Sequence, residues 1–267
     1  MASSDKQDPI LAEFGSAIYD LCARDSVNEF RAWTEQKKVT NWTGLLTAAA
    51  WRDAAEIVGF CLQQGAKVDE KPVMKAIIYD KAERVHKKLV EAKLIGPYHT
   101  IERIGDVLSV AVSNNNVEWT DFCLKHNADP NFWLYDEYKT VLAEAAENGN
   151  TTIIGLLLAN GASKQNSGAL IFAAEAGKKD AVTLLLHKGF DINEIGVAHP
   201  QDPRTLADVG TALHKAVEHN HSDVVDILLR AGIDTSLKDG QGRTALELAQ
   251  ELKQEETVAK LEKLSTA

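Results

Sequence analysis

Apolar residues recur along this chain in a pattern that predicts pairs of short helices. In one stretch, the small residues Ala145 and Ala146 precede an apolar run at helical spacing that includes Ile153, Ile154 and residues 156–158. Gly161 follows this run, and a glycine in that place suits a left-handed C-cap, where the chain can turn. One such pair of helices cannot cover its own apolar faces, so neighbouring pairs are expected to stack on one another.

The pattern is an internal repeat. The clearest copy opens at residues 210–217, continues with an apolar segment at 224–229 and closes at 231–234, and its opening recurs 33 residues later at 242–249. A leucine, an alanine and a glycine or asparagine keep the same spacing in upstream copies. Eight copies follow, with the third placed to within one residue, and their leading apolar residues are Ile18, Leu46, Val73, Leu108, Leu142, Leu170, Leu213 and Leu246.

These units resemble the ankyrin repeat, which has a Thr-Pro-Leu-His opening, two alanines, an apolar second helix and a Gly-Ala-Asp-x-Asn ending. The matching positions are Thr211 to His214, Leu156 to Leu158 with Gly161 and Ala162, Ala128 to Asn131, Gly65 with Ala66 and Asp69, and Gly189 with Asp191 and Asn193. The resemblance covers about residues 10–264, after a flexible N-terminal tail at 1–9. It implies a single all-α domain, an ankyrin-repeat solenoid of stacked helix-turn-helix units with short β-hairpin fingers.

The spacing between units is irregular. The leading residues lie 28, 27, 35, 34, 28, 43 and 33 residues apart. The short spacings predict that some units lack the finger. The 43-residue spacing predicts an inserted loop at about 194–208, which contains Pro200 and Pro203 and is expected to be exposed.

The family architecture implies that partners bind a concave surface made of finger tips and of the first, inner helix of each unit. The finger between the fourth and fifth units is aromatic, with Phe132, Trp133, Tyr135 and Tyr138, and exposed aromatic residues are typical of interface hot spots. The alternative is that these rings pack against each other and the neighbouring finger. Inner-helix positions five and six after the leading residues supply the remaining candidates, Trp51, Arg52, Tyr79, Glu147, Glu175, Glu218 and His219.

Charge narrows the class of partner. The 267 residues include 29 Lys and Arg against 39 Asp and Glu, for a net charge of −10, and no useful run of basic residues occurs. A surface of this charge repels nucleic-acid phosphates and anionic lipids, so neither nucleic acid nor a membrane is expected to bind. A protein with an apolar anchor and a basic patch would fit better. The N-terminus lacks a secretory signal and no long apolar run occurs, which predicts a location in the cytoplasm or the nucleus. The chain is expected to be monomeric on its own.

The cysteines and histidines of this chain fit structural roles better than catalytic or metal-binding ones. Cys22, Cys61 and Cys123 form no paired motif and fall on core positions, so they are expected to be buried, reduced thiols. His214 and His221 occupy histidine positions of the ankyrin pattern that serve structural hydrogen bonds, which leaves only His219 on the surface. No phosphate-binding loop or hydrolase motif occurs. We therefore expect no catalytic residue, no cofactor and no metal site.

Two functions from different classes remain. The leading one is a protein-interaction module, acting as an adaptor, an inhibitor or an assembly chaperone through its concave surface and aromatic finger. The alternative is a small-molecule-binding protein or an atypical enzyme, with its site in the concave groove under the 194–208 loop.

Overall fold

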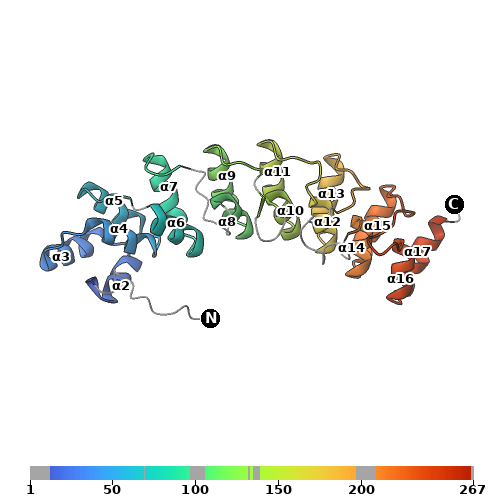
Figure 1. Cartoon of the computed structure of the whole chain (residues 1–267), viewed down its shortest axis with the longest axis horizontal. Coiled ribbons are helices and arrows are strands. Elements are labelled where there is room, and N and C mark those ends of the chain that lie inside the picture. Colours follow the sequence, from blue (N-terminus) through green and yellow to red (C-terminus); the bar gives the residue numbers. More distant parts are fainter. Residues whose placement is uncertain are drawn as a thin grey trace. The chain divides into compact units, whose positions relative to one another are not determined.

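The predicted helices are present and follow one another in pairs (Figure 1). This computed structural model describes residues 13–68, 70–96, 106–131, 133–134, 139–196 and 209–265. The first helices of the pairs are α2 (Ala17–Ala23), α4 (Trp42–Ala50), α6 (Glu70–Tyr79), α8 (Val107–Ser113), α10 (Val141–Asn148), α12 (Ala169–Glu175), α14 (Ala212–Glu218) and α16 (Ala245–Glu251). The second helices are α3 (Val27–Lys37), α5 (Ala55–Gln63), α7 (Glu83–Glu91), α9 (Val117–Lys125), α11 (Thr151–Ala159), α13 (Lys179–His187), α15 (Ser222–Arg230) and α17 (Glu255–Ser265).

Within each unit, the core lies between the two helices of a pair and between neighbouring pairs. Every leading apolar residue lies on a first helix, and all of them are buried except Leu246, which is half-buried on α16 in the last described pair. Ala145 and Ala146 are fully buried where α10 meets its neighbours. Small residues there let the helix axes approach closely, and the larger side chains fill the remaining space. The all-α repeat architecture is thus confirmed.

The chain divides within α8 into two compact units, Met1–Val110 (unit 1) and Ala111–Ala267 (unit 2). In unit 1, α4 packs against α2 and α6, and α5 packs against α3 and α7. In unit 2, α10, α12, α14 and α16 form one row of neighbours, and α9, α11, α13, α15 and α17 form the other (Figure 1). The single domain over residues 10–264 stays a prediction, and the tail at 1–9 lies outside the described residues.

The turns after the second helices have the predicted left-handed backbone. Gly161 after α11 has φ 93° and Gly232 after α15 has φ 83°, a region that a residue with a Cβ atom enters only at a cost. Asn127 takes the equivalent place after α9 with φ 66°, and asparagine is one of the residues that tolerate this conformation. These turns end one unit and direct the chain toward the next.

The fingers are short. Strands β1 (Trp133–Leu134) and β2 (Lys139–Thr140) form an antiparallel hairpin between α9 and α10, and a bridge joins Lys238 to Thr244 before α16. The 28-residue spacing between Leu142 and Leu170 agrees with the connection from α11 to α12, where residues 160–168 turn without pairing as strands. The predicted insertion begins at another bridge, Ile195 to Thr211. Its residues 197–208 lie outside the described part of the chain.

Within each unit, asparagine and aspartate side chains connect consecutive repeats through hydrogen bonds. In unit 2, the Asn131 Oδ1 atom accepts the Ser163 N–H at 2.7 Å, and the Asn193 Oδ1 atom accepts the Asp234 N–H at 2.9 Å. In unit 1, the Asp25 carboxylate accepts the N–H of Ile57 at 3.0 Å, in the first turn of α5. Each bond satisfies a main-chain donor in a different repeat, so it fixes the register of the stack.

Candidate partner-binding surface

Four carboxylates occupy the same position on four successive first helices of unit 2. Glu147, Glu175 and Glu218 were predicted from their position five residues after a leading leucine, and Glu251 stands at the same offset from Leu246. Glu251 is not among the residues predicted from the sequence, although the repeat spacing alone identifies it. We call Glu147, Glu175, Glu218 and Glu251 the inner carboxylate row; they come from α10, α12, α14 and α16, which pack side by side.

Three members of the row pair with a Lys or Arg side chain that is less exposed than the carboxylate. The pairs are Glu147 Oε2 with Lys139 Nζ at 2.6 Å, Glu218 Oε2 with Lys215 Nζ at 2.8 Å, and Glu251 Oε2 with Arg243 Nη1 at 2.8 Å. Glu147 is 35% exposed and Lys139 16%. Glu218 is 45% exposed and Lys215 10%, and Glu251 is 61% exposed and Arg243 27%. The acidic partner of each pair therefore faces solvent, and the cation lies behind it.

Lys139 links the finger to this row. It lies on β2, its Nζ atom is also 3.8 Å from Glu144 Oε2, and it sits 5.0 Å from the centroid of the Phe172 ring on α12. A cation over an aromatic face is attracted by the electrons of the ring. These contacts hold the base of the hairpin against α10 and α12.

The remaining member, Glu175, pairs with a histidine. Its Oε1 atom lies 3.6 Å from Nε2 of His219, and this pair is an ion pair only when the imidazole is protonated. The neighbouring His221 ring stacks on His219 with 6.2 Å between centroids, and its Nε2 atom lies 2.8 Å from the main-chain oxygen of Glu175. His221 is therefore structural, as predicted, whereas His219 is exposed at the end of α14.

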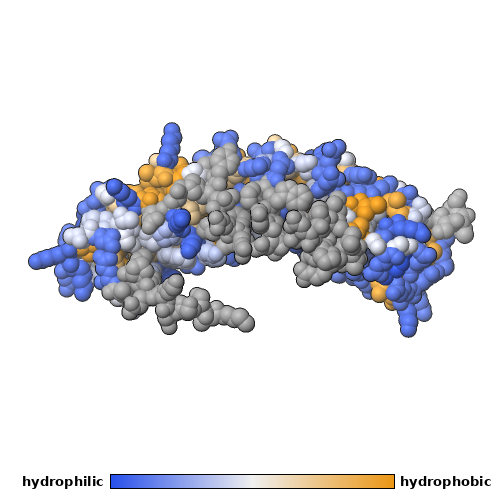
Figure 2. All heavy atoms as spheres, viewed as in Figure 1, coloured by the Kyte–Doolittle hydropathy of each residue, from blue (hydrophilic) through white to orange (hydrophobic). Residues whose placement is uncertain are grey.

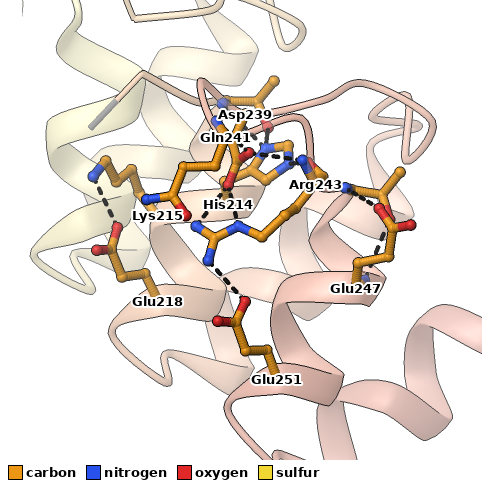
Figure 3. A network of polar contacts seen from close by, with 10 residues as sticks. His214, Lys215, Glu218, Asp239, Gln241, Arg243, Glu247 and Glu251 are labelled. Atoms are coloured by element: carbon orange, nitrogen blue, oxygen red, sulfur yellow. Dashed lines mark hydrogen bonds and ion pairs between the residues drawn. The ribbon is translucent and has the colours of Figure 1, made fainter. Parts of the chain in front are cut away.

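A polar network fixes Arg243 beside the end of the row (Figure 3). The guanidinium donates to Asp239 Oδ2 from Nε at 2.9 Å, and it reaches Glu251 from Nη1 on its other side. Burial opposes the negative charge of Asp239, but hydrogen bonds from the main chain and side chain of Arg243 and from the Gln241 N–H outweigh it and lower the pKa of Asp239. The visible surface around α16 is mostly hydrophilic (Figure 2).

His214 stands behind this network as a structural residue, as predicted. Its ring is buried, and its Nε2 atom lies 3.1 Å from the main-chain oxygen of Arg243. Burial lowers the pKa of His214 below the ordinary value for histidine, even though the bond to Arg243 opposes this shift. A buried neutral imidazole held at both nitrogens is suited to joining two repeats.

The unit 1 candidates lie at the ends of first helices. Trp51 is half-buried at the end of α4, and Arg52 is exposed with its guanidinium carbon 5.0 Å from the centroid of the Tyr19 ring. Tyr79 closes α6 and is 52% exposed. Tyr79 and Arg52 are thus open to solvent, and their role in binding stays a prediction.

The aromatic finger lies mostly outside the described part of the chain. Phe132, Tyr135 and Tyr138 are among the residues not described, and for Trp133 the structure gives only its backbone in β1.

The cysteines are core thiols, as predicted. Cys22, Cys61 and Cys123 are free and buried, and burial raises the pKa of Cys22 and of Cys61 to about 12. In the described ranges, no three His, Cys, Asp or Glu side chains are grouped so that they could hold a metal ion. No helix in the same ranges is long and apolar enough to cross a membrane.

Comparisons with known proteins agree with this architecture. A family model described as "Ankyrin repeats (3 copies)" matches residues 108–195, and one described as "Ankyrin repeats (many copies)" matches residues 197–249. Similar proteins include "Ankyrin repeat and KH domain-containing protein mask-1" of Caenorhabditis elegans, which is 30% identical over 206 residues, 73% of this chain and 7% of that protein. Protein HOS4 of Saccharomyces cerevisiae is 31% identical over 108 residues, 40% of this chain and 9% of that protein. The chain thus spans less than a tenth of either relative, and it belongs to the ankyrin repeat family.

Proposed function

We propose that this chain is a protein-interaction module that holds a basic segment of a partner protein against the inner carboxylate row of unit 2. Ankyrin repeats are in general protein-interaction modules. The observation that carries the proposal is the repetition of one outward-facing carboxylate on four adjacent first helices, three of them with the cation less exposed than the carboxylate.

The charge of the chain supports the choice of this unit. Unit 1 contains 15 basic and 16 acidic residues, whereas unit 2 contains 14 basic and 23 acidic residues. Nearly all of the net charge of −10 therefore belongs to unit 2. An acidic face attracts a basic partner and repels an acidic one, so its charge raises the association rate and improves specificity.

The spacing of the row suggests the form of the bound segment. Packed helices lie about 8–10 Å apart, and a polyproline II segment advances about 3.1 Å per residue with three residues per turn. A Lys or Arg at every third residue of such a segment lies on one face, about 9 Å from the next, and would therefore meet successive carboxylates. A stacked repeat scaffold loses little conformational entropy on binding, which favours affinity.

Apolar anchoring is assigned to the aromatic candidates. The sequence of the finger between the fourth and fifth repeats contains Phe132, Trp133, Tyr135 and Tyr138, and unit 1 contains Trp51 and Tyr79, with Arg52 next to Trp51. We place the module in the cytoplasm or nucleus, as an adaptor, an inhibitor or an assembly chaperone rather than an enzyme. The small-molecule alternative depends on the 194–208 loop, of which residues 197–208 lie outside the described part.

The proposal is tested by comparing two triple variants that remove the same charge. The inner variant combines Glu147→Gln, Glu218→Gln and Glu251→Gln, and the outer variant combines Glu118→Gln, Asp180→Asn and Glu255→Gln, which are exposed on α9, α13 and α17. Partners are captured from the native source by crosslinking to the wild-type chain, and the affinity of each purified partner is measured by titration calorimetry. Circular dichroism first establishes that both variants are folded.

We expect the inner variant to weaken binding about tenfold or more and the outer variant to weaken it only slightly. Equal losses in the two variants would mean that the partner responds only to net charge. Undiminished binding by the inner variant would place the site elsewhere. If no protein is captured by the wild-type chain, the small-molecule alternative gains support.

A further inference from the structure

A pocket of about 510 Å³ lies in unit 1, where the end of α3, the start of α4 and the end of α5 meet. Its volume falls in the range of about 300–1,000 Å³ that is usual for binding sites. Trp42 and Phe60 line it and pack edge to face, with 5.9 Å between ring centroids. This pocket contains none of the residues considered above for partner binding.

Two cations line the pocket. Arg31 places its guanidinium carbon 5.2 Å from the centroid of the Phe60 ring, and Lys38 follows α3 in a left-handed conformation with φ 52°. Neither side chain forms an ion pair with any described residue. One carboxylate, Glu35, also lines the pocket and is likewise unpaired within the described ranges. The lining therefore carries a net positive charge in a chain whose total charge is −10.

The position of Arg31 suits it to binding a carboxylate. A guanidinium that stacks on a ring keeps its N–H groups in the guanidinium plane, where they can donate two parallel hydrogen bonds to one carboxylate. Lys38 adds a second charge on the same wall. Beside these cations, the half-buried Trp42 and Val39 offer an apolar surface for a neighbouring side chain.

The lining residues also favour a peptide over an enclosed small molecule. Among them only Thr34 and Phe60 are buried, and the others are half-buried or exposed. Small-molecule sites bury about 70–90% of their ligand, which an open groove of this kind does not do. A polypeptide segment, in contrast, can cross the groove and leave most of its own surface in solvent.

We propose that this groove between α3 and α5 docks an acidic segment of a partner protein. One carboxylate of the segment binds Arg31 and Lys38, and an adjacent aromatic side chain packs on Trp42 and Val39. This surface prefers the opposite charge to the inner carboxylate row, and it lies in the other unit. It can therefore be present or absent independently of the function proposed above.

The test uses the full chain and two defined peptides. Amide and indole resonances are followed by ¹⁵N NMR during titration with acetyl-Asp-Glu-Phe-Asp-amide, and with the neutral acetyl-Asn-Gln-Phe-Asn-amide. With the acidic peptide we expect saturable shifts at Lys38, Val39 and the indole N–H of Trp42. With the neutral peptide we expect shifts that are weaker by about tenfold in affinity.

Charge variants on α3 then separate the groove from general electrostatics. Arg31→Glu and Lys37→Glu change the charge equally on the same helix, but only Arg31 lines the pocket. Arg31→Glu should lower the affinity for the acidic peptide about tenfold, and Lys38→Gln should lower it less, whereas Lys37→Glu should leave it nearly unchanged. Absence of saturable shifts at the pocket, equal response to both peptides, or an equal loss in Lys37→Glu would each overturn the proposal.

Discussion

The imidazole of His214 bridges two repeats through its contact with the main chain of Arg243. Its Nε2 atom lies 3.1 Å from the Arg243 oxygen, and its Nδ1 atom lies 3.3 Å from the Thr211 main-chain nitrogen. Because a main-chain N–H can only donate, Nδ1 is the acceptor, and the single ring proton belongs on Nε2, where it reaches the carbonyl oxygen. A second proton would place an N–H group against the Thr211 N–H in a buried site.

This arrangement predicts that the protein loses stability in mild acid. The pKa of folded His214 is lowered by burial, while the unfolded chain titrates near the ordinary value of about 6.5. As the pH falls through that value, the imidazole of the unfolded chain binds a proton before the folded one does. The stabilising contribution of His214 to the free energy of unfolding is therefore complete above about pH 6.5 and decreases as the pH falls toward the pKa of the folded state. The free energy of unfolding, measured with urea between about pH 7.5 and 5.5, should therefore fall more steeply in the wild type than in His214→Gln. Parallel slopes for wild type and His214→Gln would contradict the assignment.

A second prediction concerns Gly177, which follows α12. It has φ 65°, and a Cβ atom added to it would lie 2.7 Å from the His221 ring, which hydrogen bonds to the Glu175 main-chain oxygen. Gly232 also has a left-handed backbone, with φ 83°, but a Cβ atom there would have no neighbour within 4 Å among the described residues. Both alanine variants should lose about 1–2 kcal/mol from the backbone, and Gly177→Ala should lose about 1–2 kcal/mol more as His221 is displaced. Thermal and urea unfolding provide the measurement, and equal losses at the two glycines would show that the His221 contact contributes little.

Repeat spacing in the sequence predicts some features of this structure and not others. The leading residues, the glycine turns and the buried cysteines follow from spacing, because one local rule applies to each unit. The same rule predicts Glu251, because it stands five residues after Leu246. The rule does not predict the ion pairs of Lys139 and Arg243, because their positions depend on how the fingers fold back on the first helices.

The groove in unit 1 had no sequence signal at all. Its residues come from three different helices and are brought together only by packing. Arg31 lies on α3, Trp42 begins α4, and Phe60 lies on α5. Phe60 has the apolar character of a core residue, and Arg31 has the character of an ordinary exposed residue. Only their positions in the structure show that the ring supports the guanidinium.

A third prediction concerns Asp25, which joins the first two helix pairs. With φ 47°, its carboxylate accepts the N–H groups of Glu56 and Ile57 at 3.1 and 3.0 Å and pairs with Arg84 at 2.7 Å. Asp25→Ala leaves the start of α5 uncapped and should lower the free energy of unfolding by about 1–3 kcal/mol. Asp25→Asn keeps an acceptor oxygen and tolerates the left-handed backbone, so its loss should be clearly smaller. Chemical denaturation of both variants checks this, and an asparagine variant as unstable as the alanine variant would mean that the ion pair with Arg84 dominates.

The last prediction uses the three cysteines as reporters of opening. Only a thiolate reacts readily with iodoacetamide, and Cys22 and Cys61 are buried with pKa values raised to about 12, while Cys123 is also buried. At about pH 8 the native protein should therefore remain unmodified while the denatured chain gains three labels, as counted by mass spectrometry. Rapid native labelling of any of the three would contradict the buried core.

Labelling in increasing urea then reports which parts open together. Cys22 on α2 and Cys61 on α5 share the core of unit 1, so they should be modified at one common rate set by the opening of that unit. Cys123 on α9 reports on unit 2. In a stack of repeats each pair is stabilised only by its neighbours, so a rate for Cys123 that differs from the common rate would mean that the units open separately. Equal rates at all three cysteines would instead support the single cooperative domain over residues 10–264.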